Sequence, residues 1–248
     1  LRHFGNNIYA SSFMNLYQAS KNQTLLREHF RSHPLIIGFS NLNIYYKKYN
    51  KPLEIKNQDK YSGDSDGLSY IQVTGNCKKP SSGSGWINHK EAKKVVDVVN
   101  EIKAKNENRS LTIGIVTPFV KQKELIIDSL KEVGLAGIEV GTAHVYQGQE
   151  KDIMVFSTVI SHGIEPSAAS WISNPPNVLN VAMTRARRKL IIVGDMDYCE
   201  NNYSGEILGR LGKYCKKIHR LNNISQEQKK LFELLILNGI EPEIEYPI

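Results

Sequence analysis

The stretch 179–195, LNVAMTRARRKLIIVGD, places a helical apolar stripe directly before a continuous apolar run. Val178, Val181 and Ala182 recur at the spacing of one helix face, and residues 190–193 are all apolar. A run of this length without alternation is typical of a parallel strand that is buried on both faces. The stretch therefore predicts a short helix leading into a buried strand, which is a repeating unit of α/β proteins.

The same stretch carries a cluster of arginines. We expect Arg185, Arg187 and Arg188 to share one helix with Thr184, beside the core. Guanidinium groups bind phosphate bidentately, so a rigidly held cluster of them indicates a phosphate-binding role. The alternative is a solvated basic face on an amphipathic helix, since charged side chains are mostly exposed.

The rest of the chain alternates expected helices with expected strands. Pro34 suits the first turn of a helix, because its missing N–H would be unpaired there. Apolar residues at helical spacing predict a helix over 88–105, and a later helix is expected to end at Gly134. The expected strands span 68–74, 111–116, 138–141 and 152–160. This alternation predicts an α/β fold with a mostly parallel, doubly wound sheet flanked by helices.

Four blocks of sequence follow one another along the chain. They are LREHFRSHPLIIGFSN at 26–41, IGIVTPFVKQKELI at 113–126, VGTAHVYQGQEKDIMVFSTV at 140–159 and LNVAMTRARRKLIIVG at 179–194. Together they resemble the motifs of superfamily 1 helicases, in the branch that includes the nonsense-mediated-decay helicase. The resemblance covers about residues 25–195. It implies a RecA-like domain with the P-loop-NTPase fold, in the position of the second motor domain and without a Walker A motif of its own.

The resemblance also implies roles on the ATP side. Arg31 and Arg185 match the arginines that reach the γ-phosphate of ATP, while Gln147 and Glu150 match positions that couple the bound strand to the nucleotide and its ribose. Gly148 permits close approach of the backbone. We therefore expect Arg31, Arg185 and Gln147 to be catalytic. We expect Glu150 and Gly148 to bind the nucleotide together with the two arginines.

Polar residues follow two of the expected strands, Thr117 with Pro118 after one and Thr142 with His144 after the other. Loops after the carboxyl ends of parallel strands bind ligands in open α/β sheets. Hydroxyl and backbone N–H groups there can hold sugar-phosphate without reading bases. The resemblance implies that these residues form part of a track for single-stranded DNA or RNA. The two threonines could instead cap or turn the chain, and Trp171 could stack on a base or anchor its loop.

The motifs that hold ATP itself are not in this sequence. It contains no GxxxxGK[ST] phosphate loop. Asp195 and Asp197 follow the strand that ends the last block, which is the wrong place for a pair that holds Mg²⁺. We therefore expect ATP and Mg²⁺ to be bound mainly by an upstream RecA-like domain of the same chain, and expect residues 1–248 alone to be inactive. Two rival interpretations are a passive single-strand-binding module with decayed motor residues and a helicase–nuclease fusion in DNA repair or restriction.

The expected domains follow from the extent of the motifs. Residues 1–23 are expected to be a tail from the upstream motor domain, 24–200 the RecA-like domain, 201–223 a linker and 224–248 the truncated start of a further domain. Residues 225–248 resemble the opening of a very-short-patch-repair-like endonuclease, in which Glu227 would help to bind a metal. A plain capping helix is the alternative. Its apolar face is expected to hold Leu231, Leu234, Leu235 and Leu237.

The composition limits the remaining classes. A formal charge of +7 and a pI near 9.1 favour a polyanionic partner. The three cysteines form no CxxC pair, so we expect neither a disulfide framework nor a zinc site, in a cytoplasmic protein. No apolar run approaches the roughly 20 residues of a membrane span. His29 and His33 lack a further ligand at metal-binding spacing, so we expect them to be structural.

Overall fold

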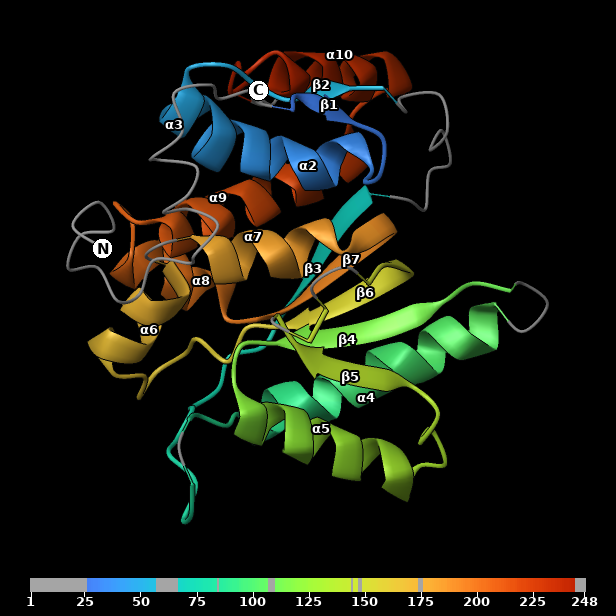
Figure 1. The fold of residues 1–248 in the computed structure, drawn as a ribbon, viewed down its shortest axis with the longest axis vertical. Coiled ribbons are helices and arrows are strands. Elements are labelled where there is room, and N and C mark those ends of the chain that lie inside the picture. The colour runs from blue at the N-terminus through green and yellow to red at the C-terminus, as the bar shows by residue number, and fades with distance from the viewer. Residues whose placement is uncertain are drawn as a thin grey trace, which may run out of the picture.

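The centre of the fold is a parallel β-sheet. The computed structural model describes residues 26–56, 67–83, 85–106, 110–143, 145–146, 149–173 and 176–243. Within these residues five strands pair in the order β3-β7-β6-β4-β5, and every neighbouring pair is parallel (Figure 1). The strands are β3 (Gly67–Gln72), β4 (Ile113–Thr117), β5 (Glu139–Thr142), β6 (Lys151–Ser157) and β7 (Ala186–Gly194). This sheet confirms the predicted α/β fold class.

The apolar run of β7 does not alternate with polar residues because the strand is buried on both faces. Leu190 and Ile192 belong to one apolar cluster, whereas Ile191 and Val193 belong to another. Because successive side chains of a strand point to opposite faces, the two clusters lie on the two sides of the sheet. All four residues are buried, so both faces need helical cover.

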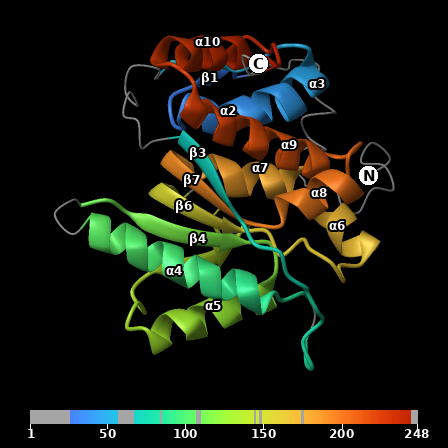
Figure 2. The same ribbon diagram turned by 180° about the vertical axis from the view of Figure 1, so that it is seen from behind.

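Helices α4 (His89–Lys105) and α5 (Val120–Glu132) cover one face of the sheet (Figures 1 and 2). Asn88 caps α4, because its side chain accepts a hydrogen bond from the Glu91 N–H. Val95 and Val99 of α4 are fully buried, and they share their cluster with Ile126 of α5. The helix predicted over 88–105 is confirmed.

Among the described residues, five helices lie on the other face of the sheet. They are α2 (Pro34–Ser40), α6 (Pro166–Ser173), α7 (Asn177–Thr184), α8 (Met196–Asn202) and α9 (Ile207–Arg220). Helix α2 continues through a π-helical segment (Asn41–Tyr45) into α3 (Tyr46–Tyr49). A short two-stranded sheet of β1 (Glu28–His29) and β2 (Glu54–Ile55) lies beyond them. Pro34 occupies the first turn of α2 as predicted.

The segment expected as a linker, 201–223, is largely helical. Helix α9 occupies most of it and ends in a 3-10 turn (Leu221–Asn223). Leu208, Leu211 and Cys215 of α9 are buried in the same cluster as β7. The basic, glycine-containing sequence was expected either to finish the domain or to link it onward, and α9 packs as part of the domain. Gly209 and Gly212 lie where backbone atoms of Tyr203 and Met196 leave no room for a Cβ. The glycines therefore allow close helix packing.

Helix α10 (Gln226–Leu237) lies against α2 (Figure 1). Phe232, Ile236 and Leu237 are its buried residues, whereas Leu231 and Leu234 are 55% and 52% exposed. Of the expected apolar face, Leu237 is buried and Leu235 is partly buried, whereas the expectation is wrong for Leu231 and Leu234. Ser225 and Gln228 form a capping box at its start. In the described part of the chain, no helix is long and apolar enough to cross a membrane.

Candidate functional site

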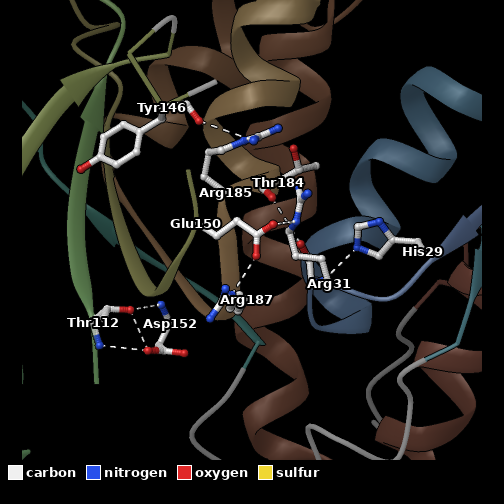
Figure 3. A network of polar contacts seen from close by, with 10 residues as sticks. His29, Arg31, Thr112, Tyr146, Glu150, Asp152, Thr184, Arg185 and Arg187 are labelled. Carbon is white, nitrogen blue, oxygen red and sulfur yellow. Dashed lines mark hydrogen bonds and ion pairs between the residues drawn. The ribbon is translucent and has the colours of Figure 1, made fainter. Parts of the chain in front are cut away.

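A cluster of arginines surrounds the Glu150 carboxylate (Figure 3). The Arg31 Nε atom lies 2.5 Å from Glu150 Oε1, and the Arg187 Nε atom lies 2.8 Å from Glu150 Oε2. Each carboxylate oxygen therefore accepts from a different guanidinium. Charge-assisted pairs of this kind are short and directional, so Glu150 fixes the relative positions of the two arginines.

All parts of the cluster lie at the amino-terminal edge of the sheet. Glu150 directly precedes β6, and Arg187 is the second residue of β7. Arg31 lies between β1 and α2, and the neighbouring His33 N–H donates to the Arg187 carbonyl at 2.8 Å. The Ser32 hydroxyl reaches the Thr184 carbonyl at 3.5 Å. These links hold the segment that carries Arg31 against the start of β7.

The helix that carries Thr184 ends earlier than predicted. Helix α7 stops at Thr184 and Arg185 is its C-cap, whereas Arg187 and Arg188 belong to β7. The strand begins here because the Lys151 N–H donates to the Arg185 carbonyl and Lys151 pairs with Ala186. The expected helical cluster is therefore a helix–strand junction. A junction restricts its side chains more tightly than a solvated helix face does.

Arg185 is a partly buried cation whose hydrogen-bonding capacity is not filled. One Nη atom lies 3.4 Å from the Tyr146 carbonyl, and the buried Nε atom has no hydrogen-bond partner within the described residues. Burial lowers the pKa of Arg185, and the charge of Arg31 lowers it further. The side chain stays protonated because the arginine pKa starts so high. A buried, charged donor beside a second cation is suited to an anion.

Two titratable groups respond to the arginines. Burial opposes ionisation of Glu150, but the hydrogen bond from Arg187 and the charge of Arg31 hold its pKa below the usual value. Burial and then the Arg31 charge lower the pKa of His29 to about 4. The neutral His29 ring accepts from the Ser32 N–H through Nε2 at 2.8 Å. His29 therefore shapes the loop that carries Arg31, in agreement with a structural role.

The residues predicted to bind nucleic acid lie at the opposite, carboxyl edge of the sheet. Thr117 ends β4 and Thr142 ends β5, and these two residues are paired in the register. Thr117 is fully buried and its hydroxyl has no partner within the described residues, and Pro118 is also buried. Thr142 is partly exposed. Of the two threonine hydroxyls, that of Thr142 is the one that a nucleic acid could reach in this structure.

Three predicted site residues, His144, Gln147 and Gly148, lie outside the described residues. The other predicted residues fall into two groups: Arg31, Arg185 and Glu150 at the amino edge, and Thr117, Pro118 and Thr142 at the carboxyl edge. The structure therefore brings the phosphate-directed group together. The group predicted to bind nucleic acid lies at the opposite ends of the strands of the same sheet.

Tyr146 occupies the segment that returns from β5 to β6. Its ring is fully buried, and its hydroxyl donates to the Glu139 carbonyl at 2.8 Å. A Cβ atom at Gly114 or Gly141 would lie within 3 Å of this ring. Tyr146 thus packs flat on β4 and β5 while its carbonyl faces Arg185. This contact joins residues from separate elements, so no local pattern in the sequence reveals it.

Lys151 and Asp152 are adjacent and opposite in charge at the start of β6, but they do not pair with each other. Lys151 instead pairs with Glu139 at 2.6 Å, and Asp152 accepts from the backbone and hydroxyl of Thr112. The pairing fails because adjacent residues of a strand point to opposite faces. Sequence reasoning also left the role of Arg187 open. The strand was expected to begin only near residue 190, so Arg187 was placed on the preceding helix and its contact with Glu150 was missed.

The polar groups present suit an anion better than a metal. Within the described ranges, no cluster of three histidine, cysteine or carboxylate side chains is placed to hold a metal ion. All three cysteines are buried and free. The unfilled donor of Arg185, with Arg31 and Arg187 nearby, suits a bound anion by its charge and its hydrogen-bonding type.

The chain is similar to known proteins over most of its length. The AAA domain family matches residues 8–197. A regulator of nonsense transcripts 1 from Dictyostelium discoideum is 29% identical over 75% of this chain, which corresponds to 14% of the relative. The probable helicase senataxin from Homo sapiens is 29% identical over 77% of this chain and 7% of its own length. The chain thus spans under a fifth of either relative.

A solved structure is also similar. It is the C-terminal domain of a possible DNA helicase from Lactobacillus plantarum, with 16% identity and a TM-score of 0.40 over 67% of this chain and 87% of that chain. The family assignment rests instead on the AAA domain match, which covers most of the 248 residues, and on the named relatives. The chain belongs to the AAA domain family, within the superfamily 1 helicases of the nonsense-mediated-decay branch.

Proposed function

We propose that the chain is the second motor domain of an ATP-dependent helicase that acts on single-stranded DNA or RNA. Its domain spans about residues 24–200, extended by α9 and α10, and an upstream RecA-like domain faces its amino edge. That upstream domain supplies most of the site for ATP and Mg²⁺. The observation that carries the proposal is the buried, unfilled Arg185 Nε beside Arg31 and Glu150.

The arginines would act on the charge of the departing phosphoryl group. As the γ-phosphoryl group leaves, negative charge spreads over its equatorial oxygens, and a correctly placed arginine stabilises that charge. The phosphate would take up the free donor of Arg185 and compete with the Tyr146 carbonyl for its Nη. Arg31 would turn its Nη atoms to the phosphate while its Nε stays on Glu150. Both guanidinium groups would be in place before ATP arrives.

The role of Glu150 in this scheme is to position the arginines. With Arg31 on one oxygen and Arg187 on the other, the carboxylate offsets part of the repulsion among three nearby cations. Because the pair is partly exposed, its contribution to stability is about 1 kcal/mol at most. Its larger effect is on geometry, since small displacements of reacting groups slow catalysis strongly.

Arginine substitutions test the proposal in the longer protein that contains the upstream domain. Arg185→Ala and Arg31→Ala should each lower ATP turnover by about 10³–10⁵-fold. Arg185→Lys should restore little, because a point charge cannot reproduce the guanidinium fork. The double mutant should lose less than the summed effects, because the two groups act together.

Two measurements separate this role from a structural one. The melting temperature and the affinity for a single-stranded oligonucleotide should stay close to wild type in both arginine variants. Arg220→Ala, which removes an exposed arginine from α9, is the matched control and should keep full turnover. If Arg185→Ala lowers turnover only in proportion to the unfolded fraction, the arginine is structural and the proposal is wrong.

A passive single-strand-binding module is the competing function. Arg31, Glu150 and Arg187 are arranged near the buried Arg185 Nε, and this arrangement argues against a passive module. A protein that only binds nucleic acid at the carboxyl edge has no use for an anion site at the amino edge. Stimulation of ATP turnover by a single-stranded oligonucleotide in the longer protein would distinguish the two. A module without motor function would show none.

A further inference from the structure

Trp171 exposes a large aromatic surface at the carboxyl edge of the sheet. This residue lies on α6 and is 46% exposed, while the chain's other tryptophan, Trp86, is 7% exposed. The Trp171 ring stacks on Phe119, with ring centroids 5.9 Å apart and an interplanar angle of 29°. Phe119 is itself only 7% exposed. One face of the indole therefore covers a buried ring, and nearly half of the residue remains open to solvent.

The stacked pair is held rigidly by its surroundings. Phe119 is the N-cap residue of α5 and directly follows Pro118. On the other side of the pair, Ala169 and Ile172 bury the inner face of α6 in the main apolar cluster. Both supports are parts of the sheet's helical layers. The indole is thus fixed beside the end of β4, where the nucleic-acid track is proposed.

Lysines lie on the loop that follows β3. Lys79 pairs with Glu165, which precedes α6, at 2.6 Å, and its Nζ lies 5.5 Å from the centre of the Trp86 ring. Lys78 and Lys90 line a cavity of about 310 Å³ between the exit of β3 and the start of α4. Aromatic rings beside positive charge are the usual components of sites for single strands.

We propose that Trp171, supported by Phe119, is a platform on which one base of a single-stranded nucleic acid stacks. The inference rests on the proposed function and adds a base contact to a track otherwise described by its sugar-phosphate contacts. Stacking requires only the π-face of a base, so the platform accepts any base. The base that lies on it would continue the Phe119–Trp171 stack outward by one ring.

Tryptophan fluorescence gives a direct test in the 248-residue chain. In a Trp86→Phe variant, Trp171 is the remaining tryptophan. Oligothymidylate should quench its emission, because a base stacked on the indole provides a path for non-radiative decay. An oligomer of the same length made of abasic deoxyribose phosphate should leave the emission unchanged. Quenching by both oligomers, or by neither, would overturn the proposal.

Binding measurements in the otherwise wild-type chain give a second test. The Kd for a labelled oligothymidylate can be measured by fluorescence anisotropy. We expect Trp171→Ala to raise this Kd by about 5- to 100-fold. Trp171→Phe should recover most of the affinity, and Trp171→Leu, which is apolar but has no π-face, should not. Leu231→Ala on α10 is the matched control for loss of an exposed apolar side chain and should bind normally. Equal affinity of the Leu and Phe variants would contradict stacking.

The outcomes separate this proposal from the proposed motor function. In the longer protein, Trp171→Ala should raise the oligonucleotide concentration needed to stimulate ATP turnover but leave the maximal turnover unchanged. Arg185→Ala should show the reverse pattern. If oligothymidylate binds and stimulates turnover while Trp171→Ala has no effect, the platform is wrong and the motor function stands. If the oligonucleotide neither binds nor stimulates turnover, both fail.

Discussion

The Glu150 carboxylate and the His29 ring show how single residues set the arginine cluster. Glu150 accepts from Arg31 and Arg187 on separate oxygens, and neutral His29 accepts from the Ser32 N–H beside Arg31. Protonation of either acceptor would remove a hydrogen bond that positions Arg31. The geometry of the cluster therefore depends on pH through two groups of opposite type.

His29 gives the cluster a measurable response to acid. Its pKa is lowered in the folded state, from 6.5 to about 4, so the folded chain binds fewer protons than the unfolded chain in this window. The contribution of His29 to stability is then complete above pH 6.5 and is lost as the pH falls towards 4. We expect the free energy of unfolding to decline by up to about 1.4 kcal/mol per pH unit in this window.

Urea denaturation between pH 4 and pH 7 measures this contribution. His29→Gln keeps an acceptor but cannot take up a proton in this range, so the variant should show a shallower decline than the wild type. His219, an exposed histidine on α9, provides the matched control. A His219→Gln variant should keep the wild-type slope. Parallel slopes in all three proteins would contradict a buried, neutral His29.

At the scale of elements, the sequence predicted those whose patterns are local. The apolar stripe of α4 and the continuous run of β7 follow directly from periodicity, and both were placed to within a few residues. The start of β7 was missed because tertiary pairing decides it: Lys151 binds the Arg185 carbonyl, and no local signal announces that contact. Helix α9 was missed because glycines that allow close packing resemble glycines of a loop.

In the candidate site, too, local motifs identify residues, whereas tertiary contacts decide where those residues lie. Arg31, Glu150 and Arg185 could be selected from motifs, but their convergence on one edge depends on the order of the strands. The burial of Thr117 and the packing of Tyr146 on β4 and β5 arise between elements that are distant in sequence. Periodicity describes how one element faces a core. It does not describe which neighbour supplies that core.

Gly38 is the point where α10 docks on α2, and it provides a test of that contact. A Cβ at this position would lie 2.2 Å from Ile236 Cγ2 and 3.0 Å from the Tyr214 hydroxyl. Gly38→Ala should therefore destabilise the chain by about 1–3 kcal/mol, as overpacking does, despite the better helix propensity of alanine. Thermal unfolding followed by circular dichroism measures the change.

Gly205→Ala is the control for this experiment, because a Cβ at Gly205 would meet no atom within 4 Å. It should leave the melting temperature nearly unchanged. An unaltered melting temperature for Gly38→Ala as well would show that α10 does not pack on α2. In that case the interpretation of 224–248 as the start of a separate domain would gain support over that of a capping helix.

At the scale of the whole molecule, the net charge of +7 should appear in the salt dependence of binding. A track that contacts several phosphates releases counterions, with a slope of log K against log salt of roughly −0.7 per phosphate neutralised on single strands. We expect a clearly negative slope for oligothymidylate. Thr142→Ala should weaken binding with the fold intact, because the partly exposed hydroxyl at the end of β5 is lost.

Arg185→Ala provides the comparison for the salt experiment, since Arg185 lies at the edge of the sheet away from the track. It should keep the wild-type affinity and slope. Affinity that does not change with salt would argue against a phosphate track. If Arg185→Ala weakens binding of the oligonucleotide and Thr142→Ala does not, the nucleic acid binds at the amino edge of the sheet and the proposed track is wrong.

The segment 143–150 makes the return from the end of β5 to the start of β6, so it has one end at each edge of the sheet. Thr142 lies at one end and Glu150 at the other, and the fully buried Tyr146 ring between them is seated on Gly114 and Gly141. The buried Tyr146 ring is therefore a fixed contact between the two ends of this connection. Under the proposed function, a displacement of Thr142 by bound nucleic acid would be transmitted past Tyr146 to the Glu150 carboxylate, and so to the arginines that it positions.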